Sequence, residues 1–203
     1  AAIFHLINHA TFKGALFMIT GGIDHSTGTR NVKKLGGLLT IMPISFTITV
    51  ITALSMAGVP PFNGFLSKEM FLTAMFDSHQ ADIFGLSTLG YLLPIVAIVG
   101  SIFTFVYSFK YVHEIFFGDY KPEALPKKPH EAPLLMLLPT GILTFLVVLF
   151  GLFPNILSNS IIAPAVRAIA PFADAPDVHI SHWHGITPAL IGTLIVFIIG
   201  FIL

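Results

Sequence analysis

Apolar runs about as long as a membrane-spanning helix recur along the whole sequence. Such a helix takes roughly 20 apolar residues, because the hydrocarbon core of a bilayer is about 30 Å thick. Charged residues make up only 10% of the 203 residues, against about 25% in a typical soluble domain. The sequence therefore predicts an all-α integral membrane protein with about five transmembrane segments, at 1–23, 38–77, 88–117, 134–153 and 185–203.

The composition excludes several classes of function. The chain contains no cysteine, so it has no disulfide, thiolate metal site or cysteine nucleophile. Its net charge is +0, and no basic face offers itself to a nucleic acid. We expect no bound cofactor. Because the chain begins and ends within apolar runs, we also expect it to be a piece of a longer polytopic protein.

The second apolar run, 38–77, is interrupted by the segment GVPPFNG. Pro60 and Pro61 remove two backbone donors, and Gly58 and Gly64 permit unusual dihedral angles. Unwound backbone at membrane depth is tolerated only where it is buried in protein or lines water, and transporters place ion sites at such breaks. The sequence thus predicts one broken helix.

The distribution of lysine and arginine predicts the orientation. Basic residues are concentrated in loops 24–37 and 118–133, whereas 77–87 contains none. Both basic loops lie on one side only if 38–77 crosses the membrane once, and short basic loops favour the cytoplasmic side. We therefore expect the N-terminus and the segment 154–184 to face outward.

Lys68 and Glu69 are adjacent in the second half of the predicted broken helix, and we expect them to form an ion pair. A lysine at the centre of a bilayer costs about 2.5–3.5 kcal/mol on insertion scales, so such residues usually face a protein interior or a wet cavity. We interpret the pair as part of an ion or proton pathway. The alternative is a re-entrant connection from which Lys68 reaches the membrane interface.

His5, His9 and Lys13 follow one another at four-residue steps, which places them on one face of a helix. Two histidines at this spacing could bind zinc, but Lys13 would repel the cation and no carboxylate is near in sequence. The histidines could also make only structural hydrogen bonds. We favour a proton wire, because histidine titrates near neutral pH and a buried lysine can release its proton. Other side chains could fill gaps in it: Thr11, Ser67 and Thr73.

Two further groups are weaker candidates. One lies near the inner end of the third span, where long side chains reach the interface, although it could form the inner mouth of a pathway. The other, in the segment HISHWH, could bind a metal, but its tryptophan is typical of a membrane interface and favours a solvated loop. The groups are Lys110, His113 and Glu114, and His179, His182 and His184.

Three segments, HLINHATFKGALFM, DHSTGTRNVKKLGGL and SMAGVPPFNGFLSKEMF, closely resemble the antiporter-like subunits that Mrp-type sodium/proton antiporters share with respiratory complex I. The resemblance is strong over 1–117. The following segment, YKPEALPKKPHEAPLLMLLP, is more similar to the A subunit of the Mrp antiporters than to its complex I relatives.

The resemblance implies two inverted bundles of five helices, each with one broken helix. Residues 1–117 would hold the later helices of the second bundle, and 118–203 a cytoplasmic loop, further transmembrane helices and an outer interfacial segment. Lys13 resembles the central lysine of the proton channel, with His5 and His9 beside it. Lys68 resembles the lysine of the second broken helix, near the outward exit.

The resemblance further implies a secondary transporter rather than an enzyme. It would exchange cytoplasmic sodium for external protons in a bacterial plasma membrane, driven by the proton motive force. Its partners would be other antiporter subunits, the two ions and membrane lipid. The main alternative is the corresponding proton-pumping subunit of an NADH–quinone oxidoreductase. A purely structural scaffold would tolerate replacement of Lys13 and Lys68.

Overall fold

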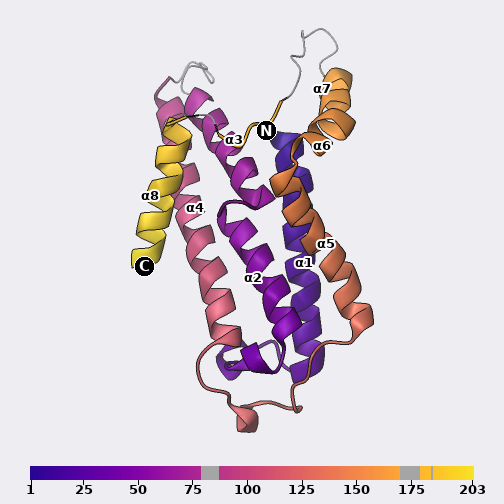
Figure 1. Cartoon of the computed structure of the whole chain (residues 1–203). Helices are drawn as coiled ribbons and strands as arrows, with labels where there is room; N and C mark the ends of the chain where they lie inside the picture. Colours follow the sequence, from indigo (N-terminus) through magenta and orange to yellow (C-terminus); the bar gives the residue numbers. More distant parts are fainter. Residues whose placement is uncertain (79–86, 170–178, 184) are drawn as a thin grey trace.

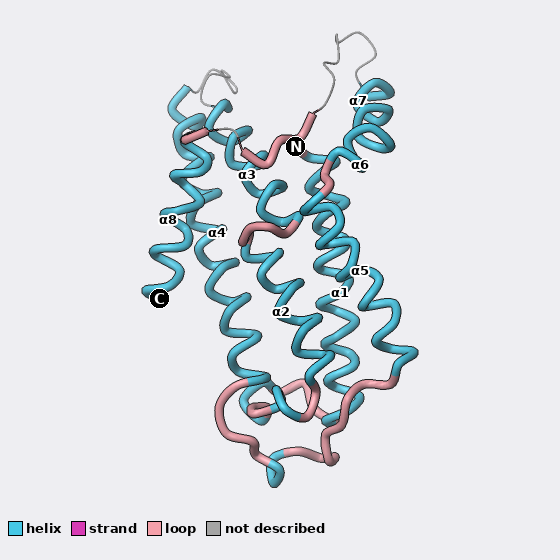
Figure 2. The backbone as a smooth tube through the Cα atoms, viewed as in Figure 1, coloured by secondary structure: helices cyan, strands magenta, loops and turns pink. Residues whose placement is uncertain are grey.

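The regular structure is helical throughout the part of the chain that the computed structural model describes (Figures 1 and 2). The described residues are 1–78, 87–169, 179–183 and 185–203. The longer helices are α1 (Ala2–Thr27), α2 (Pro43–Ala57), α3 (Asn63–Asp77), α4 (Ser87–Phe116), α5 (Leu134–Leu152) and α8 (Pro188–Ile202). The shorter ones are η1 (Val32–Lys34), η2 (Leu38–Thr40), η4 (Pro122–Ala124), α6 (Asn155–Leu157), the π-helical η5 (Ser158–Ile162) and α7 (Ala163–Ile169).

Three of the described helices are long and apolar enough to cross a membrane on their own. They comprise Ala2–Thr27, Leu92–Phe116 and Leu134–Leu152, whereas Pro43–Ala57 and Pro188–Ile202 are shorter apolar helices. The prediction of an all-α protein with membrane-spanning helices is confirmed, whereas the count of five spans stays a prediction.

The first helix extends beyond the predicted end of its apolar run at residue 23. It continues to Thr27 and ends where Gly28 adopts a φ of 76°, a left-handed conformation that glycine reaches without steric cost. Asp24, in its last turn, forms an ion pair with Arg30 at 2.8 Å. A helix can thus leave the apolar region and end among polar residues.

Helices α2 and α3 follow one another end to end in Figure 1, and an irregular stretch at 58–62 separates them. Gly58 ends α2 with a φ of 83°, while Asn63 and Gly64 already belong to the first turn of α3. A Cβ atom on Gly64 would lie 1.8 Å from the carbonyl oxygen of Ser55. This glycine is therefore required by the close approach of the two helices rather than by unusual dihedral angles.

The connection between α1 and α2 and the connection between α4 and α5 lie at the lower end of the bundle in Figure 1 and contact each other. The backbone N–H of Gly37 donates to the carbonyl of Phe117 at 3.0 Å. The carboxylate of Glu131 accepts hydrogen bonds from the backbone N–H groups of Ile44 (2.8 Å) and Ser45 (3.3 Å). These N–H groups lack partners within α2, and a negative charge is favourable at a helix N-terminus. Both basic loops thus lie at one end of the bundle.

Helices α2 and α3 run through the middle of the bundle (Figure 1). Helix α1 contacts both of them and α5 on one side, while α4 contacts both of them and α8 on the other. Apolar clusters fill the space between these helices. One is built around Ile19, Leu38 and Phe116 at the end of the basic loops, and another around Phe4 and Leu66 at the opposite end. The polar face of α1 is left to line the space between α1, α3 and α4.

Candidate functional site

A cavity of about 460 Å³ lies between α1, α3 and α4 and contains cationic side chains from two separate sequence motifs. His5, His9 and Lys13 reach it from α1, and Lys68 reaches it from α3. We call it the cationic cavity. The structure therefore brings together four of the five residues predicted for the proton pathway. No Asp or Glu lines this cavity among the residues that the structure describes.

The four-residue spacing on α1 produces a continuous file of polar side chains. The ring centroids of His5 and His9 are 5.8 Å apart, and Nδ1 of His5 lies 2.6 Å from Oγ of Ser67 on α3. Nζ of Lys13 lies 5.5 Å from the ring centroid of Tyr107 on α4, a cation–π distance. The file thus runs along α1 and is connected to both neighbouring helices.

The end of α2 holds the ammonium group of Lys68. Nζ of Lys68 donates to the carbonyl oxygen of Ala57 at 2.9 Å, and a helix C-terminus is the negative end of the helix dipole. Gly58 makes room for the side chain, because a Cβ atom there would lie 2.8 Å from Cδ of Lys68. The interruption between α2 and α3 therefore provides an acceptor for a lysine that has no carboxylate beside it in the cavity.

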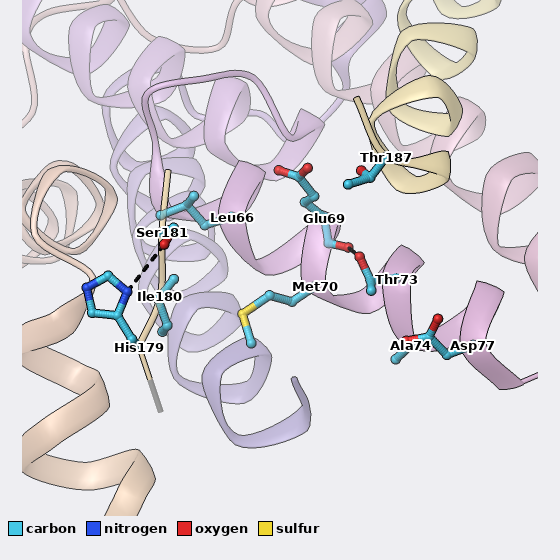
Figure 3. A pocket seen from close by; sticks show the side chains of 10 residues that line it. All are labelled: Leu66, Glu69, Met70, Thr73, Ala74, Asp77, His179, Ile180, Ser181 and Thr187. Carbon is cyan, nitrogen blue, oxygen red and sulfur yellow. Dashed lines mark hydrogen bonds between the residues drawn. The ribbon is translucent and has the colours of Figure 1, made fainter. Parts of the chain in front are cut away.

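Glu69 faces a different cavity, of about 360 Å³, together with Asp77 and His179 (Figure 3). We call this the acidic cavity; its other polar lining residues are Thr73, Ser181 and Thr187. Consecutive residues on a helix point about 100° apart, so Lys68 and Glu69 lie on different sides of α3. The predicted pairing of Lys68 with Glu69 is wrong, because the ammonium group bonds to Ala57 instead.

A buried amide network connects α1 to the junction of α2 and α3. Nδ2 of Asn63 donates to Oδ1 of Asn8 (3.0 Å) and to Oγ1 of Thr11 (3.1 Å), and Oγ of Ser55 donates to Oδ1 of Asn63 (2.7 Å). Asn8, Ser55 and Asn63 are all fully buried. Thr11 thus belongs to this network rather than to the proton file. The sequence signal that could have identified this network is the presence of asparagines within apolar runs, Asn8 and Asn63.

Helix α4 contributes polar side chains that the sequence reasoning did not single out. Ser101, Thr104 and Tyr107 line the cationic cavity at three-residue steps, which places them along one side of the helix. The hydroxyl of Tyr107 donates to the sulfur of Met56 at 3.6 Å. The repeated polar residues at helical spacing within an otherwise apolar run were the available signal.

The weaker candidates lie outside the cationic cavity. Lys110 and Glu114 form an exposed ion pair at 3.6 Å, and the His113 ring stacks on Phe117 at a centroid distance of 5.9 Å. Thr73 does not fill a gap in the file, since its hydroxyl donates to the carbonyl of Glu69 at 2.9 Å.

The histidines near the C-terminal helix have separate contacts. Nδ1 of His179 lies 3.2 Å from Oγ of Ser181, a contact drawn in Figure 3, and Nε2 of His182 lies 2.9 Å from the carbonyl of Gly151. His184 lies outside the described residues. Within the part of the chain that the structure describes, no group of three or more His, Asp or Glu side chains could hold a metal ion.

Comparison with known proteins shows what this chain is similar to. Residues 1–94 match the family described as "NADH:quinone oxidoreductase/Mrp antiporter, TM". The chain is 68% identical over 203 residues to the Na(+)/H(+) antiporter subunits A1 of Staphylococcus aureus strains Newman and COL. The match covers 100% of this chain but 25% of the relatives, so the chain spans a quarter of their length.

Two solved structures share the fold. The Mrp complex from Dietzia sp. DQ12-45-1b superposes with a TM-score of 0.78 at 32% identity, covering 99% of this chain and 20% of that chain. The membrane-bound sulfane sulfur reductase, an archaeal respiratory membrane complex, gives a TM-score of 0.68 at 27% identity, covering 99% of this chain and 32% of that one. Over its whole length the chain is therefore similar to part of Na(+)/H(+) antiporter subunit A1, its fold is similar to part of a solved Mrp complex, and its residues 1–94 match the membrane family of NADH:quinone oxidoreductase and Mrp antiporters.

Proposed function

We propose that the chain forms part of the ion-translocating subunit of a multisubunit sodium/proton antiporter in a bacterial plasma membrane. The observation that carries this proposal is the cationic cavity, where His5, His9 and Lys13 of α1 meet Lys68 of α3. The antiporter subunits named above support the choice of ions, because they align with the entire chain. The protein works as a secondary transporter, driven by the proton motive force, and not as an enzyme.

Protons pass along the cationic cavity by steps between neighbouring side chains. His5 is the central link, since it contacts Ser67 beside Lys68 on one side and His9 on the other. Groups that share a cavity and become positive when protonated disfavour each other's charged form. A proton that loads one position therefore favours release from its neighbour.

Helices α2 and α3 cross the membrane together as one interrupted span, and α8 completes a set of five. A helix of 15 residues is about 22 Å long, which is shorter than the roughly 30 Å hydrocarbon core. The end-to-end arrangement of α2 and α3 supports a joint crossing. So does the position of both basic loops at one end of the bundle, because basic loops favour a single side.

The test is sodium-dependent pH exchange in inverted membrane vesicles that contain the whole complex. With Lys13→Ala or Lys68→Ala, exchange should fall at least about 100-fold, the usual contribution of a side chain that transfers a proton. The matched control is Lys33→Ala, an exposed loop lysine, which should leave exchange unchanged. Near-normal exchange by both cavity variants would overturn the proposal and show that the chain serves only as a scaffold.

A second candidate function is proton pumping in an NADH–quinone oxidoreductase, which the matched family also contains. The same vesicles distinguish the two. Exchange of sodium for protons without NADH supports the antiporter, whereas pumping that requires NADH and stops with a quinone-site inhibitor supports the oxidoreductase. The match of the entire chain to part of the antiporter subunits makes the first outcome the expected one.

A further inference from the structure

A second, smaller cavity adjoins the cationic cavity toward the basic loops. Its volume is about 150 Å³, and three of its lining residues, Lys13, Met56 and Tyr107, also line the cationic cavity. Thr20 and Tyr111 line the rest of it together with apolar side chains. We call it the tyrosine cavity. Lys13 therefore stands between two cavities, one on each side along α1.

A hydrogen bond between α1 and α4 marks the far end of the tyrosine cavity. The hydroxyl of Thr20 donates to the carbonyl of Leu16 at 2.7 Å, which uses its single proton. Its oxygen lies 2.6 Å from the hydroxyl of Tyr111, so Tyr111 donates to Thr20. Thr20 is seven residues beyond Lys13, about 10 Å nearer the basic loops at the rise of an α-helix.

We propose that the tyrosine cavity connects Lys13 to the side of the membrane on which the basic loops lie, and that the Tyr111–Thr20 hydrogen bond closes it. This inference rests on the proposed antiport. It assigns Thr20, Tyr107 and Tyr111 to the pathway, in addition to the residues of the cationic cavity. Lys13 then exchanges protons with one side through the tyrosine cavity and with His9 on the other.

The chemistry of the lining supports a proton route. A tyrosine hydroxyl both donates and accepts, so Tyr111 can accept one proton as it donates another once Thr20 moves away. The cavity is large enough for several water molecules, since each occupies about 30 Å³ in the liquid. Its apolar walls, Leu16 and Phe17 among them, confine the route to the hydroxyl groups.

The opposing explanation is that the hydrogen bond only fastens α1 to α4. Tyr111→Phe and Thr20→Val remove one hydroxyl each with little change in shape, and side-specific pH measurements separate the two explanations. In proteoliposomes with the whole complex, pH is varied on the basic-loop side while the opposite side is held constant, and then the reverse. We expect exchange to fall several-fold and the pH profile of the basic-loop side alone to shift. Unchanged profiles on both sides would overturn the inference.

Thiol labelling tests access to the cavity directly. This chain has no cysteine, so Thr20→Cys introduces a single thiol into it, in a complex whose other cysteines are replaced. Gly21→Cys is the matched control, because residue 21 lines neither cavity and is exposed on a helix apolar enough to cross a membrane, where its thiol would face lipid instead of water. A membrane-impermeant reagent should modify Thr20→Cys from the basic-loop side and leave Gly21→Cys unmodified. No reaction at position 20, or equal reaction at both positions, would contradict the inference.

The two proposals fail in distinguishable ways. If Lys13→Ala retains exchange, the antiport pathway through the cationic cavity is wrong and the tyrosine cavity has no role in it. If Lys13→Ala abolishes exchange while Tyr111→Phe and Thr20→Val retain normal rates and profiles, only the role of the tyrosine cavity is overturned.

Discussion

The cationic and acidic cavities lie on different sides of α3 and contain side chains of opposite charge. Lys68 enters the first, where four groups can become positive and no carboxylate is among the described lining residues. Glu69 enters the second, where the described lining residues also include the carboxylate of Asp77 and the imidazole of His179. Two residues that are adjacent in sequence are therefore separated by the helix that carries them.

This difference shows how a membrane protein can hold a lysine without pairing it to a carboxylate. The ammonium group of Lys68 bonds to the carbonyl of Ala57 at the end of α2, so its charge is stabilised by a helix terminus. An ion pair inside the bilayer would hold a proton-carrying lysine in its charged form. A single neutral acceptor stabilises the charge less, which suits a group that must release its proton.

The largest expected effect concerns the need for proton release in the cationic cavity. Arginine keeps its proton at any physiological pH, so Lys13→Arg preserves the charge but removes the relay. Exchange should fall at least about 100-fold in vesicles with equal amounts of assembled complex. Lys33→Arg, on an exposed loop, controls for the change of side chain. Near-normal exchange by Lys13→Arg would refute proton release and make that lysine a fixed charge.

A second prediction addresses the junction that separates the two cavities. Gly64→Ala places a Cβ atom 1.8 Å from the backbone of Ser55, which cannot move aside as a side chain would. The clash should destabilise the complex by about 1–3 kcal/mol, the usual cost of overpacking, and displace Lys68 and Glu69 together. Thermal unfolding of the purified complex measures the loss. Gly141→Ala on α5 has open space around its Cβ position and should leave the melting temperature unchanged. An unchanged melting temperature for Gly64→Ala would contradict the tight packing.

The membrane class and the set of cationic residues could be predicted from sequence because both depend on local patterns. Apolar runs predict helices, and the four-residue spacing of His5, His9 and Lys13 places them on one face wherever the helix packs. The sequence also predicted where regular helix would stop, at Gly58 and the prolines after it. None of these inferences required knowledge of how the helices are rotated against one another.

The contacts of individual side chains could not be predicted because they depend on that rotation. Helix geometry alone argues against pairing of Lys68 with Glu69, because consecutive residues point about 100° apart, but only the orientation of α3 shows which cavity each side chain enters. The same applies to Asn63, which reaches across to Asn8 on α1. Tyr107 was overlooked because the row of hydroxyls that it forms with Ser101 and Thr104 does not show what it faces until α4 is placed across the cavity from α1.

Removing a carboxylate from the acidic cavity should have a smaller effect on exchange. Glu69→Gln removes a carboxylate that faces away from the cationic cavity, so proton relay between the lysines should persist. The carboxylates of the acidic cavity should instead concentrate cations near the opening of that cavity. Loss of the Glu69 carboxylate should lower exchange by about tenfold at most at low ionic strength, with less effect at high salt. Asp77→Asn, at an exposed position, should give a still smaller loss. A loss as large as that of Lys68→Ala, and independent of salt, would mean that the two cavities form one path.

The smallest perturbation tests which side of the membrane each end of the helix bundle faces, without changing transport. Single cysteines at Lys33 and Lys128 should react with an impermeant thiol reagent from the cytoplasmic side only, and a cysteine at Asp77 from outside only. All three side chains are exposed, so the labelling reports sidedness rather than burial. The expectation follows from the basic loops lying at one end of the bundle while α3 ends at the other. Labelling of positions 33 and 128 from opposite sides would exclude a joint crossing of α2 and α3. Labelling of position 77 from the cytoplasm would place the acidic cavity on the same side as the tyrosine cavity, and the cationic cavity could then no longer connect the two faces of the membrane.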